Sequence, residues 1–285
     1  MLPRSLHTIS IIFRHGAALM AKPIIKWAGG KQGVAETIVS HFPNRYRVYY
    51  EPFVGGGSIL LTLNPKQAII GDLNKWLVDT YKAVRKDWQK VATILDCMVN
   101  SKEYFLGIRL EHPDNVNIYE RAARFIYLNK TCFRGLFRVN KNGQFNVPYG
   151  AYSRRYYDPD NLKEFSKSPE SLDVRWGDFE LISKDISKDD FIYLDPPYYR
   201  LGGYSDFNRY TQNQFRENDQ IRLANFCNIL DDNGIRWAQS NSNTPFIQKL
   251  YSRFRINRIK NRREINLNSA NRDIDELLIM NYSGH

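Results

Sequence analysis

Short apolar runs that end at an acidic or glycine-rich segment recur along this chain of 285 residues. The clearest run is Phe191–Leu194, four apolar or aromatic residues followed by Asp195 and two prolines. Such a run is typical of a strand buried on both faces, and proline cannot continue a ladder of hydrogen bonds. The pattern therefore predicts a strand that presents Asp195 at its carboxyl end, where ligands bind in open α/β sheets.

The same reasoning predicts further elements along the chain. Apolar runs bounded by turn residues indicate strands at Arg47–Glu51, Ala68–Gly71, Leu172–Trp176, Ile235–Gln239 and Glu276–Tyr282. Helical spacing of apolar residues indicates helices near Val34–His41, at Ser58–Leu63, from Leu77 to about Leu128, at Tyr119–Lys130 and at Phe215–Leu230. Arg200–Arg209, rich in Gly, Tyr and Asn, is expected to form a mobile loop near the site.

A glycine loop joins the first strand to the next helix in the segment EPFVGGGS, Glu51–Ser58. A strand, a glycine loop and a helix form the usual nucleotide-type site of an α/β sheet. The loop lacks the Gly-Lys-Ser/Thr ending of a P-loop, so a phosphate is not indicated. Asp72 follows at about the 20-residue offset at which an acid meets ribose hydroxyls. The ligand is therefore expected to be a nucleoside, and the alternative role for Asp72 is to cap a helix.

Two further segments carry candidate ligand groups. In KWAGGK, Lys26–Lys31, the glycines permit close approach of the backbone, Trp27 offers an apolar wall and Lys31 can meet a carboxylate. The alternative is an ordinary Gly-Gly turn before a helix. Asp178 and Phe179 follow another strand and can bind the amino group and the face of an adenine, or Asp178 can simply cap a helix.

The tetrapeptide Asp195-Pro196-Pro197-Tyr198 suits methylation of an exocyclic amine. The lone pair of such a nitrogen is delocalised into the base ring, so the nitrogen is a poor nucleophile. Asp195 can accept one N–H and the carbonyl of Pro196 the other, which favours a pyramidal nitrogen. Tyr198 can stack on a base taken out of the duplex. The alternative is an ordinary Asp-Pro turn.

Composition favours a folded protein with a polyanionic partner. The chain is 42% hydrophobic with a net charge of +11, and its three separated cysteines predict neither a metal site nor disulfides and fit a reduced cytoplasm. No apolar run approaches the roughly 20 residues that span a membrane. Basic, amide and aromatic residues interleave from Asn129 to Tyr152, and Asn142-Gly143 predicts a hairpin that reads DNA or is merely solvated.

Taken in order, these segments resemble the Dam-like, D12-class DNA adenine-N6 methyltransferases of the α group. The resemblance runs from about Lys22 to Tyr282, through KWAGGK, EPFVGGGS, the acid of GDLN at Asp72, GLFRVNKNGQFNVPYG at Gly135–Gly150, GDF at Gly177–Phe179 and DPPY. It implies an α/β, Rossmann-like sheet that binds S-adenosylmethionine, with an inserted, mainly helical DNA-recognition domain and a β-hairpin. The implied division is a disordered extension at 1–21, a catalytic domain at 22–78 and 170–285, and a recognition domain at 79–169 with the hairpin at 133–150.

The resemblance also implies roles for individual residues. Catalysis is assigned to Asp195, Pro196, Pro197 and Tyr198, and no metal is implied. Donor binding is assigned to Trp27, Gly29, Gly30, Lys31, Glu51, Phe53, Gly55, Asp72, Asp178, Phe179 and Asp195. DNA binding is assigned to Phe133, Arg134, Leu136, Arg138, Asn140 and Pro148, and three of these (Leu136, Arg138 and Pro148) match positions that read GATC. Arg134 departs from the Asn that relatives often have, which affects the expected GATC target.

The expected function is therefore methylation of adenine N6 in double-stranded DNA, by base flipping and direct transfer from S-adenosylmethionine. The alternatives are amino-methylation of another DNA sequence, of RNA or of a protein amide, and a DNA-binding module without activity. A dinucleotide-dependent oxidoreductase is disfavoured because no second catalytic constellation is present. We expect a cytoplasmic monomer of bacterial or phage type, and the sequence leaves open whether a companion restriction endonuclease exists.

Overall fold

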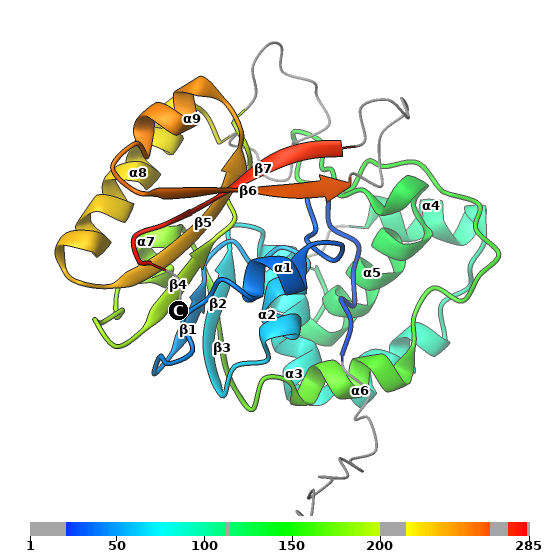
Figure 1. Cartoon of the computed structure of the whole chain (residues 1–285). Coiled ribbons are helices and arrows are strands. Elements are labelled where there is room, and N and C mark those ends of the chain that lie inside the picture. Colours follow the sequence, from blue (N-terminus) through cyan, green and yellow to red (C-terminus); the bar gives the residue numbers. More distant parts are fainter. Residues whose placement is uncertain (1–20, 112–114, 200–214, 263–272, 284–285) are drawn as a thin grey trace, which may run out of the picture.

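The computed structural model describes residues 21–111, 115–199, 215–262 and 273–283 (Figure 1). Almost all of the predicted N-terminal extension, and the loop predicted at Arg200–Arg209, lie outside these ranges. The expectations for those two segments therefore stay predictions.

One seven-stranded sheet organises the described chain, in the order β3-β2-β1-β4-β5-β7-β6. Strands β1 to β5 run parallel, and β7 is antiparallel to both β5 and β6. The predicted fold class, an α/β protein with a Rossmann-like sheet, is confirmed. The strands are β1 Tyr49–Glu51, β2 Gln67–Asp72, β3 Ser171–Trp176, β4 Phe191–Leu194, β5 Arg236–Ser242, β6 Arg255–Arg262 and β7 Asp273–Met280.

Side chains of the central strands alternate between two hydrophobic cores, as the period of two requires. In β4, Phe191 and Tyr193 enter one core, while Ile192 and Leu194 enter the other, and all four are fully buried. Helices cover both faces, with α8 and α9 on one side of the sheet and α1, α2 and α3 on the other (Figure 1). This double covering explains why the strand sequences read as continuous apolar runs.

Four helices, α1, α2, α5 and α8, begin and end near the predicted positions, whereas α6, α7 and α9 had no predicted range. The region predicted as helical from Leu77 to about Leu128 contains three helices, α3, α4 and α5, because polar breaks at Ser101 and Asn117 each cap a new helix. The helices are α1 Ala35–Val39, α2 Ser58–Leu63, α3 Lys75–Asp96, α4 Lys102–Leu110, α5 Ile118–Thr131, α6 Pro159–Lys167, α7 Phe179–Ile182, α8 Glu217–Asp232 and α9 Pro245–Leu250, with a 3₁₀ turn at Phe133–Gly135.

The helical region lies beside the sheet and is joined to it by α3 (Figure 1). Helix α3 packs against α5 and α6 as well as against β2 and β3. It continues without interruption across residue 78, where the division between catalytic and recognition domains is predicted. Helix α3 is therefore shared by the two regions, and the division into domains stays a prediction.

The amino end of β4 is anchored by a buried carboxylate, Asp190. Its oxygens accept hydrogen bonds from the Arg47 guanidinium at 3.0 Å, from the Val48 N–H at 3.1 Å and from both N–H and hydroxyl of Ser187 at 2.9 and 3.0 Å. Burial alone would raise the pKa of Asp190, but the hydrogen bonds from Arg47 and Ser187 outweigh it and the pKa is lowered. Asp190 is thus a structural acid at the opposite end of β4 from Asp195.

We predict that Asp190→Ala lowers the free energy of unfolding by about 2–3 kcal/mol, because buried N–H groups lose their acceptor. Chemical unfolding of the purified protein measures the difference. Asp189→Ala is the matched control: its side chain is exposed, so a change within about 0.5 kcal/mol is expected. Equal effects of the two variants would contradict the structural role of Asp190.

Candidate active site

Acidic side chains gather at the carboxyl edge of the parallel strands. Glu51 ends β1, Asp72 ends β2 and Asp195 directly follows β4. Asp178 lies two residues beyond the end of β3. Because these four strands are consecutive neighbours with the same direction, the topology brings together acids that are up to 144 positions apart in the sequence (195 − 51 = 144).

The loop after β1 is shaped by Gly55, whose φ of +47° is unfavourable for other residues. A Cβ at Gly55 would lie 2.6 Å from Cδ1 of Trp27, so the indole packs directly on the loop backbone. The Gly55 carbonyl accepts a hydrogen bond from the Tyr81 hydroxyl at 2.6 Å. Trp27 therefore packs on the glycine loop, and only glycine fits beside its indole. Its role as an apolar wall for a ligand stays a prediction.

Asp72 is held by the backbone on both sides. Its Oδ2 accepts from the Gly55 N–H at 3.2 Å and its Oδ1 from the Asn74 N–H at 2.9 Å. Burial raises the pKa of Asp72 to about 6, against the opposing effect of these hydrogen bonds. The N-cap of α3 is Asn74, which accepts from the Leu77 N–H, so the alternative role of Asp72 as a helix cap is wrong.

Glu51 is the most deeply buried acid at this edge, with 2% of its surface exposed. The Tyr49 hydroxyl donates to its Oε2 at 2.8 Å. Burial raises the pKa of Glu51 to about 8, and the charge of nearby Asp195 adds to that effect. A cationic ligand group placed at Glu51 would reverse this shift.

Lys31 meets Asp195 at the end of β4. Its ammonium lies 2.9 Å from Oδ1 of Asp195, 2.9 Å from the carbonyl of Gly29 and 4.7 Å from the centre of the Tyr198 ring. Burial raises the pKa of Asp195 to about 6, and the Lys31 ammonium opposes that shift. The sequence-based expectation that Lys31 meets a carboxylate is confirmed, and Gly30 closes the turn by donating its N–H to the Trp27 carbonyl at 3.1 Å.

The two prolines after Asp195 are fixed by a buried amide. Gln220 on α8 donates to the carbonyl of Pro197 at 2.8 Å, and its own oxygen accepts from Asn241 at 3.0 Å. The carbonyl of Pro197 is therefore already the acceptor of a hydrogen bond within the protein. Pro196 is buried and Pro197 is exposed.

Asp178 and Phe179 lie together at the end of β3, as the sequence suggests. Asp178 caps α7 by accepting from the Glu180 N–H at 3.2 Å, which confirms the alternative role of Asp178 as a helix cap. Arg222 of α8 also binds both oxygens of Asp178, at 3.2 and 2.6 Å, and its guanidinium lies 4.5 Å from the centre of the Phe179 ring. Phe53 packs against Phe179 at 5.5 Å.

The predicted hairpin is confirmed by antiparallel bridges between Cys132 and Tyr149 and between Val139 and Phe145. Its side chains alternate between two environments. The inward residues Phe137, Phe145 and Val147 are buried in the helical region. The residues predicted to contact DNA are exposed or half-buried and form what we call the outward face: Phe133, Arg134, Leu136, Arg138, Asn140 and Pro148. Of these, Leu136 also packs in part against the hydrophobic core.

Individual side chains on the outward face differ in how they are held. Arg138 donates to the Asn146 side chain at 2.7 Å, across the hairpin. The Asn140 oxygen accepts from the Asn142 and Gln144 N–H groups, both at 3.0 Å, so this side chain builds the turn. Contacts of these residues with DNA stay predictions.

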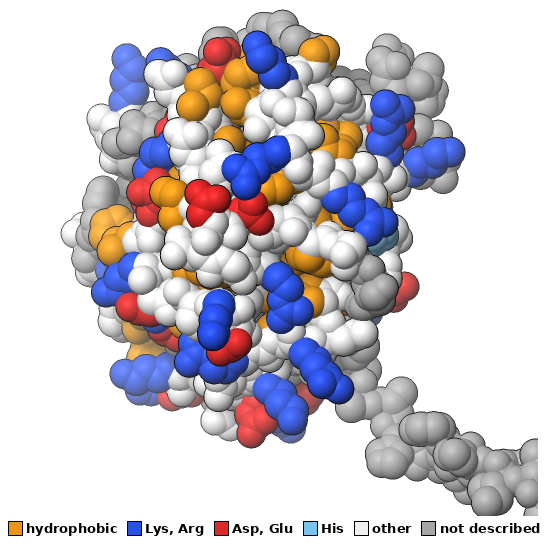
Figure 2. All heavy atoms as spheres, turned by 60° about the vertical axis from the view of Figure 1, so that its left-hand side comes forward, with side chains coloured by type: hydrophobic (Ala, Val, Ile, Leu, Met, Phe, Trp, Pro, Cys, Tyr) orange, Lys and Arg blue, Asp and Glu red, His pale blue; other side chains and the backbone are white. Residues whose placement is uncertain are grey.

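Basic side chains gather beside the hairpin. Lys26, Lys130, Arg154 and Arg155 line one hollow of about 440 Å³ between α5, α6 and the segment that follows the hairpin. Burial, then the charges of Lys26 and Arg154, lower the pKa of Lys130 to about 8, which is the response expected of a cation that lacks sufficient counter-charge. On the face shown in Figure 2, by contrast, Lys and Arg are scattered and mixed with Asp and Glu.

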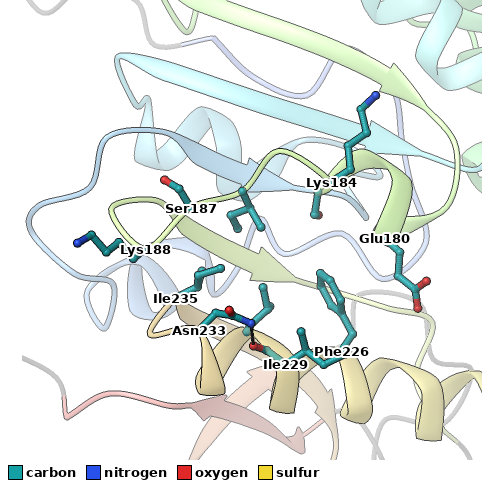
Figure 3. Close-up of a pocket in the computed structure, with 11 residues that line it drawn as sticks. Glu180, Lys184, Ser187, Lys188, Phe226, Ile229, Asn233 and Ile235 are labelled. Carbon is teal, nitrogen blue, oxygen red and sulfur yellow. Dashed lines mark hydrogen bonds between the residues drawn. The ribbon is translucent and has the colours of Figure 1, made fainter.

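A second hollow, of about 410 Å³, contains none of the predicted site residues. It lies between α8 and the segment after α7, and Phe226, Ile229 and Ile235 form part of its wall (Figure 3). Lys184 and Lys188 extend away from it to opposite sides. We assign this hollow no part in the chemistry.

Two residues at the site have no counterpart among the sequence-based candidates. Arg222 reaches the site from α8, and Glu276 of β7 accepts a hydrogen bond from the Tyr198 hydroxyl at 3.0 Å. The sequence offers one clue to Glu276, an acid at the start of the apolar run Leu277–Met280. Among the described residues no cluster of metal ligands is found, and no helix there is long and apolar enough to cross a membrane.

Comparisons with known proteins agree with this geometry. A family model described as D12 class N6 adenine-specific DNA methyltransferase matches residues 27–265. Similar proteins include the Type II methyltransferase M.MjaIII of Methanocaldococcus jannaschii (40% identical, covering 92% of this chain and 99% of that one) and the Type II methyltransferase M1.LlaDCHI of Lactococcus lactis subsp. cremoris (35%, 92% and 95%). A DNA adenine methylase of Haemophilus influenzae is 32% identical, covering 89% of this chain and 91% of its own.

We predict that Glu51→Gln stabilises the protein increasingly as pH rises. The pKa of Glu51 is about 8 in the folded protein and about 4.3 in an unfolded chain. Between these two pH values the folded protein binds one proton more at Glu51 than the unfolded chain does. The stability that the protonated Glu51 gives the wild-type protein is therefore fully present below the unfolded pKa and is lost as pH rises through 8. Relative to wild type, the free energy of unfolding of the variant should therefore grow by about 1 kcal/mol or more from pH 5 to pH 8.5.

Chemical unfolding at the two pH values, without added ligand, measures this change. Glu170→Gln, at an exposed position, is the control and should show no comparable growth. A Glu51→Gln difference that is flat or shrinks with pH would show that Glu51 is ionised in the folded protein.

Proposed function

Because the chain belongs to the D12 class of N6 adenine-specific DNA methyltransferases, we propose that it transfers the methyl group of S-adenosylmethionine to an adenine flipped out of GATC. Family membership makes the chain an adenine-specific DNA methyltransferase. The proposal adds the donor, the target sequence, base flipping and the roles of individual residues. The observation that carries it is the convergence of Asp195, Lys31 and Tyr198 at the end of β4.

The donor site fits a cationic nucleoside. Gly55 allows the Trp27 indole to pack directly on the loop after β1, and Asp72 stands where an acid binds ribose hydroxyls. Burial raises the pKa values of Glu51 and Asp72 to about 8 and about 6, so each carboxylate favours a positively charged partner. S-adenosylmethionine, when bound, supplies an electrophilic methyl group on its positively charged sulfur. We assign Asp178 and Phe179 to the adenine of S-adenosylmethionine. Asp178 would then accept hydrogen bonds from both Arg222 and this adenine.

Asp195 is the residue that prepares the nucleophile. Its carboxylate accepts one N–H of the adenine N6 amino group, and the carbonyl of Pro196 accepts the other. The nitrogen lone pair then leaves the ring plane and forms the new C–N bond as the bond from sulfur to the methyl carbon breaks. The amine becomes acidic only as it gains the methyl group, so Asp195 need not remove a proton first. Positioning supplies most of the rate acceleration.

Lys31 keeps Asp195 in the form that this role needs. The carboxylate, with a pKa of about 6, is the hydrogen-bond acceptor, and the Lys31 ammonium at 2.9 Å favours it over the neutral acid. The same ammonium lies over the Tyr198 ring. The ring of Tyr198 therefore has the Lys31 ammonium on one face. We propose that the ring stacks on the flipped adenine.

The hairpin is assigned to the reading of duplex DNA. Phe133, where the hairpin begins, is 46% exposed. It is the candidate wedge that fills the space left by the flipped adenine. Leu136, Arg138 and Pro148 share the outward face, from which side chains can reach base edges in a groove. The basic cluster beside the hairpin supports binding of the phosphate backbone.

We predict that Asp195→Ala lowers methyl transfer to DNA by about a thousandfold or more, since the loss removes both acceptor and charge from the reacting amine. Single-turnover transfer of radiolabelled methyl groups to DNA measures the rate. The unfolding transition should persist, because Asp195 lies at the edge of the site and not in either hydrophobic core. Asp190→Ala is the matched variant at the other end of β4, and it should lose stability while each folded molecule keeps its turnover. Retained turnover in Asp195→Ala would overturn the assignment.

We predict that expression in a host without adenine methylation makes plasmid DNA resistant to a nuclease that cuts unmethylated GATC. A nuclease that cuts only methylated GATC should gain activity on the same DNA. Incorporated methyl groups without either change would refute GATC as the target. In that case Arg134→Asn, which restores the residue common in relatives at this position, should be compared on the same plasmid.

A further inference from the structure

Glu276 lies at the edge of the site on a strand that runs opposite to the others. Strand β7 is antiparallel to β5, and the register pairs Glu276 with Ser242, the last residue of β5. The amino-terminal part of β7 is therefore at the same edge as the carboxyl ends of β4 and β5. Only 5% of Glu276 is exposed, and the residues from Leu277 to Met280 are fully buried.

The contacts of Glu276 lead directly to the reacting groups. Its Oε2 accepts the hydrogen bond from the Tyr198 hydroxyl at 3.0 Å. The ring of Tyr198 carries the Lys31 ammonium 4.7 Å from its centre, and that ammonium binds Asp195 at 2.9 Å. Tyr198 thus stands between Glu276 and the pair formed by Lys31 and Asp195.

A carboxylate is a costly choice for this position. Removing a charge from water is unfavourable, and the negative charge of Glu276 acts on Asp195, raising its pKa further above the ordinary range. A glutamine could accept the same hydrogen bond without either cost. Burial, together with the charges of Asp195 and Glu276, raises the pKa of Tyr198 well above its ordinary value, so the phenol remains a donor. Hydrogen bonds to charged acceptors are stronger than neutral ones, which fixes the hydroxyl more firmly.

We propose that Glu276 is a positioning residue for methyl transfer, which fixes the Tyr198 hydroxyl and so holds the aromatic ring in the plane that supports the flipped adenine. The proposal rests on the proposed function of Tyr198. The ring of a tyrosine turns about two side-chain bonds, and its hydroxyl is the point furthest from the backbone. The hydroxyl oxygen lies on the axis of the Cβ–Cγ bond, so a hydrogen bond there restricts rotation about Cα–Cβ. The Lys31 ammonium over the ring face restricts rotation of the ring plane about Cβ–Cγ.

The test compares Glu276→Ala, Glu276→Gln, Tyr198→Phe and the double variant Glu276→Ala/Tyr198→Phe. Each is assayed for single-turnover methyl transfer and for the fluorescence of 2-aminopurine at the target base, which reports unstacking. We expect Glu276→Ala and Tyr198→Phe each to lower the transfer rate by about 10- to 100-fold, with the KM for DNA changed much less. Both should alter the 2-aminopurine signal, and Glu276→Gln should recover most of the rate because its amide oxygen accepts the same hydrogen bond.

The double variant separates positioning from general damage. If Glu276 acts through the Tyr198 hydroxyl, the double variant should be no slower than the slower single variant. The control is Tyr193→Phe, which removes a different buried hydroxyl. Tyr193 lies within β4, and its hydroxyl is hydrogen-bonded to Ser240 at 2.6 Å. In the double variant Glu276→Ala/Tyr193→Phe, the two reductions in transfer rate should multiply, because Tyr193 and Glu276 share no hydrogen bond.

Three results would overturn the proposal: multiplicative effects of Glu276→Ala and Tyr198→Phe, equal losses in Glu276→Gln and Glu276→Ala, or a Glu276→Ala rate equal to that of wild type. If Glu276→Ala fails to fold, Tyr198→Phe and Glu276→Gln still test the contact. Failure of wild-type protein to methylate DNA would instead refute the proposed function.

Discussion

The burial of several carboxylates at one edge of a parallel sheet is the constraint on which the site depends. Burial raises the pKa of Glu51 to about 8 and those of Asp72 and Asp195 to about 6. Each acid is held by a separate partner: the Tyr49 hydroxyl, backbone N–H groups and the Lys31 ammonium. A cation that enters this edge favours the charged forms, so binding of a sulfonium compound should be coupled to release of protons.

The segment around Lys26 connects this edge to the DNA-reading region. Asn129, fully buried on α5, accepts from the Lys26 N–H at 2.7 Å and donates to the carbonyls of Lys26 and Gly135 at 2.9 and 3.1 Å. The same short segment supplies Trp27 to the glycine loop and Lys31 to Asp195. The base of the hairpin is therefore linked through this segment to both the glycine loop and Asp195.

Local patterns predicted six of the seven strands but missed β6, Arg255–Arg262, whose sequence is dominated by basic and amide residues. They also predicted which acids lie at the strand ends. The run Phe191–Leu194 alternates between two cores, which is why it reads as continuously apolar, and its end presents Asp195. Other features depend on tertiary contacts that no local pattern encodes. Asn74 and not Asp72 caps α3, because the helix begins at Lys75, and Asp72 instead joins the loop at Gly55 to the start of the helix. Glu276 and Arg222 reach the site from elements that contact it only in the folded chain.

The base of the hairpin shows how the fold prepares a protruding side chain before DNA is present. Arg134 and Gly135 both have left-handed backbone angles, with φ of +58° and +68°, and this conformation is unfavourable for arginine. It is maintained by a hydrogen bond from the Arg134 N–H to the Tyr152 hydroxyl at 2.9 Å and by the close packing of Gly135 against Lys26. The sharp turn leaves Phe133 exposed, with the Arg134 guanidinium 5.1 Å from its ring centre. The strained backbone at Arg134 is thus offset by contacts within the fold. If Phe133 contacts DNA as proposed, this fixed turn should lower the cost of ordering it on binding.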